Sequence, residues 1–114
     1  DTISGKVSLL ESAKRKSLHI AAVFACNFVN PFYTLAANYL NDRDIPFEVL
    51  HPLIEETARK ALEMHPKLAQ TGPAIRFDEN IINDHLDSLK DYPPLKELYN
   101  SISRSIFELH QTKK

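Results

Sequence analysis

Apolar residues are most concentrated between residues 18 and 40. From Ile20 to Val29 the chain is apolar except at Asn27. A helix that is apolar on all sides belongs in the interior of a fold. At about 1.5 Å per residue, residues 18–40 would span roughly 35 Å, close to the width of a small domain. We therefore expect a long central helix, from about Ser12 to Leu40, that the rest of the chain surrounds.

Pro31 lies inside this predicted helix. A proline in a helix interior removes one N–H and pushes against the carbonyl four residues earlier, which here belongs to Asn27. The pattern therefore predicts a kink at this height. Asn27 and Asn30 are three residues apart and so share one helix face at the same height. A buried amide is costly unless it is hydrogen-bonded, so these two side chains need an explanation.

Three further stretches have apolar positions at helical spacing. The first has Pro46 near its start, a predicted kink at Pro52 and an end near Met64. The non-periodic segment 65–78 follows it, and Pro66 could open one helical turn there. Asp78 is a strong N-cap for the next helix, and Pro94 suits the first turn of the last one. The apolar stripes of these last two helices are Ile81, Ile82, His85, Leu86 and Leu89, then Leu95, Leu98, Tyr99, Ile102, Ile106 and Leu109. The sequence predicts an all-α fold of about four main helices around a long kinked central helix.

Composition narrows the possible partners. The chain has 114 residues, enough for one domain, and its net charge of −1 argues against a nucleic-acid partner. Asn27, Asn30, Pro31 and Asn38 interrupt the central run before about 18 clean apolar residues accumulate, which argues against a membrane span. The single cysteine, Cys26, cannot form an internal disulfide, so a reducing, cytoplasmic location fits best. We expect Cys26 to be a small buried hydrophobe.

Glycine is scarce: Gly5 and Gly72 are the only two. A glycine-rich loop that cradles a dinucleotide pyrophosphate cannot be built from them, so we expect no cofactor-binding fingerprint within this chain. The chain opens on Asp1, and its first residues read as the middle of a longer protein. We expect residues 1–11 to connect from an N-terminal domain and residues 12–114 to form the helical domain.

Two groups of residues could bind a small molecule. Asn27 and Asn30 could present their amides to a ligand, or they could satisfy neighbouring backbone at the kink. Thr71, Gly72 and Arg76 precede a helix N-terminus, which tends to collect anions, and Arg76 adds a donor fork suited to a carboxylate or phosphate. In the alternative reading the glycine marks a turn, Asp78 is a cap and Arg76 is a surface charge.

The histidines offer weaker candidates. His19 lies two turns before Asn27, and His85 lies on a predicted apolar stripe, where a histidine is usually a satisfied core group. His51 and Glu55 are four residues apart on a helix but lack a third ligand at useful spacing, so we expect no metal site.

Three motifs in order carry a resemblance to a known family. They are Leu18-His19-Ile20-Ala21-Ala22-Val23-Phe24 with Asn27-Phe28-Val29-Asn30, then Pro52-Leu53-Ile54-Glu55-Glu56-Thr57, then Ala69-Gln70-Thr71-Gly72-Pro73-Ala74 with Arg76 and Asp78. Together they resemble the helical C-terminal domain of uncharacterised Rossmann-type proteins described as NADP oxidoreductases. That domain is similar to the dimerisation domain of pyrroline-5-carboxylate reductase and, more distantly, to the C-terminal domain of 6-phosphogluconate dehydrogenase.

The resemblance implies a homodimer and a missing Rossmann domain that holds NADP or NAD. It implies that Asn27, Asn30, Thr71, Gly72 and Arg76 face a small-molecule substrate over the nicotinamide, with His19 and Asp78 as further candidates. The lysine that the 6-phosphogluconate and hydroxyacid dehydrogenases place four residues before their asparagine falls at Val23 here, so its acid–base role is not transferred. Family members also usually carry a histidine at the position of Pro31.

The resulting function prediction is the substrate-lining and dimerising domain of an NAD(P)-dependent oxidoreductase, which would not be catalytic alone. The alternative is a helical interaction module with no enzymatic role, in which the asparagines and the loop are structural. A glycine-rich strand–turn–helix upstream in the parent reading frame would favour the first.

Overall fold

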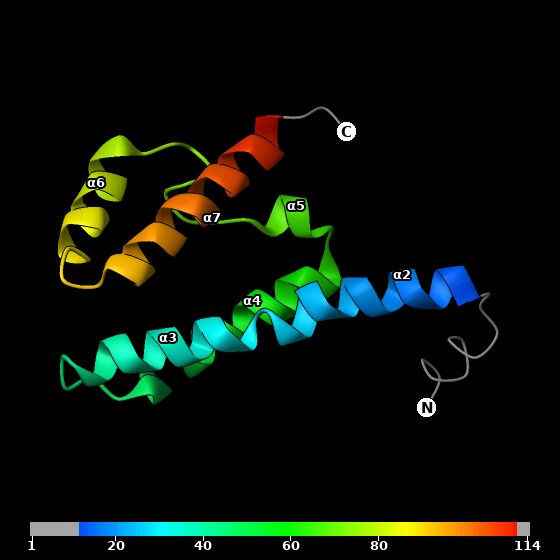
Figure 1. Ribbon diagram of the computed structural model, residues 1–114, viewed down its shortest axis with the longest axis horizontal. Helices are drawn as coiled ribbons and strands as arrows, with labels where there is room; N and C mark the ends of the chain where they lie inside the picture. The colour runs from blue at the N-terminus through cyan, green and yellow to red at the C-terminus, as the bar shows by residue number, and fades with distance from the viewer. Residues whose placement is uncertain (1–11, 112–114) are drawn as a thin grey trace. The chain divides into compact units, whose positions relative to one another are not determined.

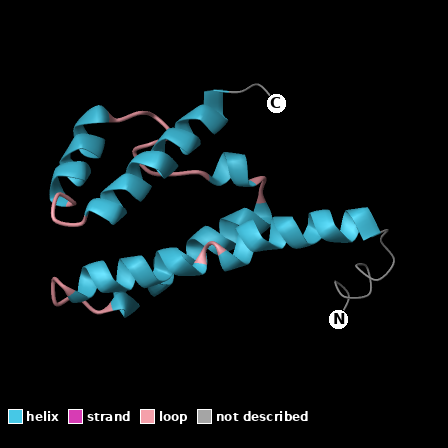
Figure 2. Cartoon of the chain, in the orientation of Figure 1, coloured by secondary structure: helices cyan, strands magenta, loops and turns pink. Residues whose placement is uncertain are grey.

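The computed structural model describes residues 12–111, so the predicted connection at residues 1–11 lies outside the described part of the chain. Every regular element among residues 12–111 is a helix, which confirms the all-α prediction (Figures 1 and 2). The described chain divides into two units, one through Val49 and one from Leu50 onward. The elements are α2 (Ser12–Ala22), the π-helical turn η1 (Val23–Asn27), α3 (Asn30–Asn41), the 3-10 turn η2 (Phe47–Leu50), α4 (His51–Glu63), α5 (Pro66–Ala69), α6 (Glu79–Ser88) and α7 (Pro93–Gln111).

The first unit consists mainly of the rod formed by α2, η1 and α3. The predicted irregularity is present, but it begins before the proline. The Phe28 N–H donates to the Val23 carbonyl, five residues back, at 2.8 Å. Pro31 then lies in the first turn of α3, where its missing N–H is tolerated. The Phe32 N–H donates to the Val29 carbonyl at 3.0 Å, and Phe28 and Val29 keep helical backbone angles, so the hydrogen-bond pattern changes while the rod continues.

The rod is exposed. No residue of α2, η1 or α3 is buried, and Phe24 and Phe28 are 64% and 51% exposed. The prediction that residues 20–29 lie in an interior is therefore wrong for the described chain, and so is the prediction that Cys26 is buried. The physical reason is that the first unit holds little besides the rod and its turn, too little to surround an element that is apolar on every side.

By length and composition alone, Ser12–Asn41 could cross a membrane, because its most apolar 18-residue window has a mean hydropathy of 1.4. A core helix of a soluble protein or a signal sequence meets the same criteria. The expected absence of a membrane partner therefore stays a prediction.

The second unit begins with two proline-started helices. The predicted short turn, η2, precedes Pro52, but Pro52 lies in the first turn of α4, so a new helix starts there in place of the predicted kink. Arg59 on the exposed side of α4 donates from Nε to Glu56 at 3.0 Å and from Nη1 to Glu63 at 2.6 Å. The hydrogen bond from Arg59 lowers the pKa of the Glu56 carboxyl. Pro66 opens the single turn of α5, also as predicted, and the His65 side chain caps it by accepting from the Lys67 N–H at 3.1 Å.

Helices α6 and α7 form a hairpin joined by residues 89–92 (Figure 1). Asp78 is the N-cap of α6, as the sequence predicts, and its Oδ1 accepts from the Ile81 N–H at 3.3 Å. Two members of the predicted α6 stripe, Ile82 and Leu89, are buried, whereas Ile81 is 38% exposed. The remaining buried apolar residue among those described is Ala74, so this hairpin and the loop before it hold the small core of the unit.

Replacing Asp78 with alanine should lower the free energy of unfolding by about 1 kcal/mol, because the Ile81 N–H loses its side-chain acceptor at a helix start. Asp78→Asn is the matched control, since an asparagine cap keeps the acceptor oxygen and should retain most of the stability. Denaturant-induced unfolding followed by circular dichroism measures both variants. Equal losses for alanine and asparagine would contradict the capping account.

Candidate functional site

The two candidate asparagines lie on either side of the break in the rod. Asn27 ends the π-helical turn and Asn30 begins α3, and both are exposed. Neither side chain forms a hydrogen bond to any residue in the range 12–111. The reading in which these amides satisfy nearby backbone therefore finds no support in the described chain. Single π-helical turns inside α-helices are frequent at functional sites, which adds to the interest of this position.

The sequence pattern did not indicate the π-helical turn. Pro31 signals a break, but nothing in the residues Val23 to Asn27 distinguishes a π-helical turn from regular helix. His19, the further candidate on α2, is exposed in the last turn of that helix.

The second candidate group lies together in one loop. Gly72 adopts a φ of 99°, a left-handed conformation that L side chains rarely adopt, so glycine is required for the backbone there. Arg76 folds back over the loop: its Nη1 donates to the Gly72 carbonyl at 3.3 Å, and its Nε lies 3.7 Å from Asp78 Oδ2. Because 61% of the Arg76 side chain is still exposed, the guanidinium keeps donors for a ligand.

Internal contacts fix the rest of this loop. The Asp78 N–H donates to the Pro73 carbonyl at 3.0 Å, and the Phe77 N–H donates to the Ala74 carbonyl at 3.1 Å. Thr71 is exposed, and its carbonyl accepts from the Gln70 side chain at 2.9 Å. Asp78 acts as the predicted cap and holds the start of α6, so the loop combines the structural role of the alternative reading with an exposed cation.

The structure therefore brings together Thr71, Gly72, Arg76 and Asp78. Asn27 and Asn30 belong to the first unit and the loop to the second, and that the two groups share one site stays a prediction.

His85 and His110 each contact a residue of another helix. His85 Nδ1 lies 2.7 Å from the Tyr99 hydroxyl, with the rings edge to face, and this contact joins α6 to α7. Burial raises the pKa of the Tyr99 hydroxyl. His110 lies between the carbonyl oxygens of Ile106 and Lys67, each 2.9 Å from a ring nitrogen, and so connects α7 to α5. These contacts favour the structural interpretation of His85.

Neither a metal site nor a dinucleotide loop is found among residues 12–111. No group of three or more His, Cys, Asp or Glu side chains there could hold a metal ion. The loop at Gly72 contains one glycine, and the helix start that follows it is already capped by Asp78, so it does not fit a pyrophosphate.

Comparison with known proteins supplies the family. The chain matches the family model described as a domain of unknown function, DUF2520, over residues 1–106. The chain belongs to the DUF2520 family. Among solved structures, this DUF2520 chain is similar to the crystal structure of a "putative NADP oxidoreductase" from Bacteroides fragilis, with 57% sequence identity and a TM-score of 0.84. The match covers 87% of this chain and 38% of that protein.

No curated protein matches the DUF2520 chain. The family and the solved structure agree with the resemblance to a helical domain associated with NADP oxidoreductases. The likeness to pyrroline-5-carboxylate reductase and to 6-phosphogluconate dehydrogenase stays a prediction.

Replacing Gly72 with alanine should destabilise the DUF2520 domain by about 1–2 kcal/mol, because a side chain is strained at positive φ. No atom lies within 4 Å of the added Cβ, so the loss comes from the backbone and not from a clash. Gly72→Asn should lose less, since asparagine tolerates positive φ better than alanine. Thermal unfolding of the two variants measures the difference, and an alanine variant as stable as the native protein would contradict this account.

Proposed function

We propose that this chain is the substrate-lining and dimer-forming helical part of an NADP-dependent oxidoreductase. The observation that carries the proposal is the 57% identity, over 87% of the chain, to a protein described as an NADP oxidoreductase. The chain spans 38% of that protein, which leaves ample length for a separate dinucleotide-binding domain. With no glycine-rich loop of its own, this chain would leave the NADP or NAD to that domain and contribute side chains to the substrate.

The exposed rod supports a homodimer in which a second subunit covers it. Residues 18–40 contain no Asp, Glu, Lys or Arg, and the core of a protein interface is likewise depleted of charge and enriched in aromatic residues. Phe24 and Phe28 pack edge to face, with ring centroids 5.0 Å apart, yet both rings remain more than half exposed. Phenylalanine is among the residues enriched in the cores of protein interfaces. The exposed large apolar residues of the rod are Leu18, Ile20, Phe24, Phe28, Phe32 and Tyr33.

The substrate would be a small molecule with a carboxylate or phosphate. Arg76 supplies exposed guanidinium donors in a loop held by Gly72 and Asp78, and an arginine fork suits such anions. Asn27 and Asn30 supply two amides that are not used within the described chain, and amides can both donate to and accept from a polar substrate. Thr71 adds an exposed hydroxyl, and His19 is a further candidate.

We propose that the protein works in the cytoplasm, without a nucleic-acid or membrane partner.

A non-enzymatic interaction module is the second candidate. The same uncovered apolar rod favours it, because such a surface could bind a different protein instead of a second copy. The two candidates differ in cofactor binding. An oxidoreductase must bind a nicotinamide cofactor in its intact form, whereas an interaction module has no need of one.

Phe24→Glu in the intact protein should convert a dimer to a monomer at micromolar concentration. It places a charge where the proposal expects a desolvated aromatic anchor, and such a change typically weakens association at least tenfold. Leu62→Glu is the matched control, since Leu62 is an 87% exposed apolar residue of α4, outside the rod. Size-exclusion chromatography with light scattering reads the mass of both variants. A native protein that is monomeric at every concentration would contradict the homodimer.

Arg76→Ala should weaken binding of an acidic substrate by about tenfold while the melting temperature changes little, because Arg76 is exposed and its ion pair is a surface one. Thermal-shift screening of the intact protein with NADPH and NADH, followed by small oxo- and imino-acids, identifies the ligands. Lys90→Ala is the matched control: it removes a positive charge outside the loop and should leave the affinity for these ligands unchanged. The absence of any nicotinamide binding would refute the oxidoreductase, and equal ligand affinity in both variants would remove Arg76 from the site.

A further inference from the structure

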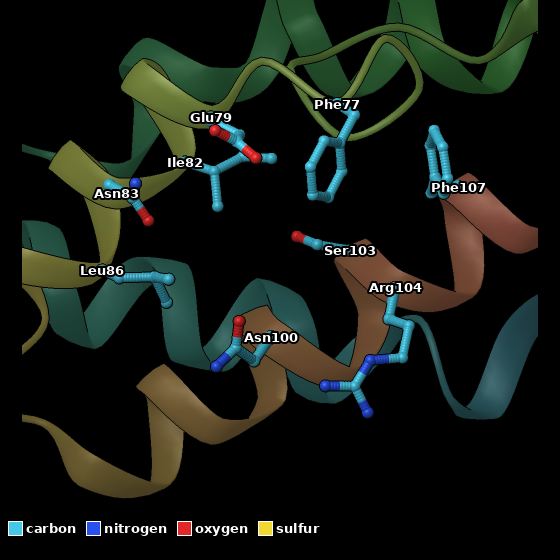
Figure 3. Close-up of a pocket in the computed structure, with 9 residues that line it drawn as sticks. All are labelled: Phe77, Glu79, Ile82, Asn83, Leu86, Asn100, Ser103, Arg104 and Phe107. Carbon is cyan, nitrogen blue, oxygen red and sulfur yellow. The ribbon is translucent and has the colours of Figure 1, made fainter.

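A pocket of about 410 Å³ lies between α6 and α7 (Figure 3). None of its lining residues is one that the sequence proposed as a site, although Phe77 and Glu79 flank Asp78 in the chain. This volume falls within the range of small-molecule sites. The lining residues are Phe77, Glu79, Ile82, Asn83, Leu86, Asn100, Ser103, Arg104 and Phe107. The pocket lies entirely within the second unit, so its walls come from the hairpin and the residue before the α6 cap.

The pocket has an apolar side made by four side chains. Phe77 and Phe107 face each other at one end, with ring centroids 5.1 Å apart and planes inclined by 48° (Figure 3). Ile82 and Leu86 on α6 continue this surface, and Ile82 belongs to the small core. A flat ring can pack against such aromatic and aliphatic walls with little loss of conformational freedom.

An unusual backbone conformation presents one of the two rings. Phe77 adopts a φ of 48°, a positive value that is rare for a bulky side chain, and the residue is 51% exposed. The loop contacts around Gly72 and Asp78 maintain this conformation. The backbone conformation therefore sets the direction in which the Phe77 side chain leaves the chain, and its ring packs against Phe107.

The polar side of the pocket is unpartnered. Among residues 12–111, the side chains of Asn83, Asn100, Ser103 and Arg104 form no hydrogen bond or ion pair. The Ser103 hydroxyl and the Asn100 amide extend into the pocket from α7, and Arg104 on the same helix also lines it (Figure 3). Arg104 differs in this respect from Arg59 and Arg76, which both have carboxylate partners.

We propose that this pocket binds a small aromatic carboxylate, with the ring against Phe77 and Phe107 and the carboxylate on Arg104. The unpaired guanidinium selects an anion, and the aromatic walls select a flat apolar body. The Asn100 amide and the Ser103 hydroxyl can donate to the same carboxylate. Glu79, the one acidic lining residue, lies on the first turn of α6, where the helix dipole favours its negative charge.

A matched pair of probes tests the proposal. 2-Naphthoate and 2-naphthamide have the same two-ring body and differ in charge. Isothermal titration calorimetry on the intact protein should show millimolar or tighter binding of naphthoate and at least tenfold weaker binding of naphthamide. Glu79→Gln should tighten naphthoate binding, because it removes the one negative charge that lines the pocket.

Three variants locate the binding. Arg104→Gln should weaken naphthoate at least tenfold, whereas Lys90→Gln, which removes the same charge outside the pocket, should leave the affinity unchanged. Arg76→Ala should also leave it unchanged, which separates this pocket from the substrate site proposed above. Arg104 is exposed, so the variant is expected to fold, and its melting temperature checks this.

Several results would overturn the proposal. They are no binding of naphthoate in the millimolar range, equal affinity for naphthoate and naphthamide, and equal affinity in Arg104→Gln and Lys90→Gln. A change of oligomeric state in Arg104→Gln would show that a second copy of the chain fills the pocket instead. None of these outcomes depends on nicotinamide binding, so the pocket can fail while the proposed oxidoreductase stands, and the reverse.

Discussion

The apolar rod formed by α2, η1 and α3 is not covered by any other part of the described chain. Residues 18–40 contain no Asp, Glu, Lys or Arg, and His19 is the one titratable base among them. None of these residues is buried within the described chain. Exposing an apolar surface to water carries a free-energy cost that grows with its area, and large exposed apolar surfaces are typical of interaction sites. The proposed dimer rests on that requirement.

The regular helix of the rod is interrupted between Val23 and Asn30. Pro31 cannot continue a helical hydrogen-bond ladder, and the chain adapts with a π-helical turn before it and a new helix start at it. Asn27 and Asn30 lie on either side of this break with unused amides. After this break, by contrast, the prolines at positions 46, 52, 66 and 93 lie before or within the first turns of helices, where a missing N–H is tolerated.

Much of the fold could be predicted because its signals are local. The cap at Asp78, the helical turn opened by Pro66, and the apolar stripe that includes Ile82 and Leu89 are all read from a few neighbouring residues. The burial of Cys26 was predicted wrongly, because an apolar sequence shows that a surface needs a cover but not whether the same chain provides it. A contact with a second molecule leaves the same pattern as a contact with a core.

Of the two candidate sites in the second unit, one could be predicted from local sequence and the other could not. The Thr71 to Asp78 loop could be predicted because Gly72 and Asp78 impose their conformations locally. The pocket around Arg104 could not, since it joins side chains of α6 to side chains of α7, and their proximity depends on the turn between the two helices. The positive φ of Phe77 was equally hidden, because a phenylalanine gives no signal for that conformation.

Hydrogen–deuterium exchange of the intact protein tests the central claim most directly. Peptides that cover Val23 to Pro31 should exchange slowly in concentrated native protein and faster on dilution, because a second subunit covers the rod and its irregular hydrogen bonds only when the dimer forms. The faster exchange should also appear in Phe24→Glu at high concentration. Rapid exchange at every concentration, identical in the native protein and the variant, would show that nothing covers the rod and would contradict the account.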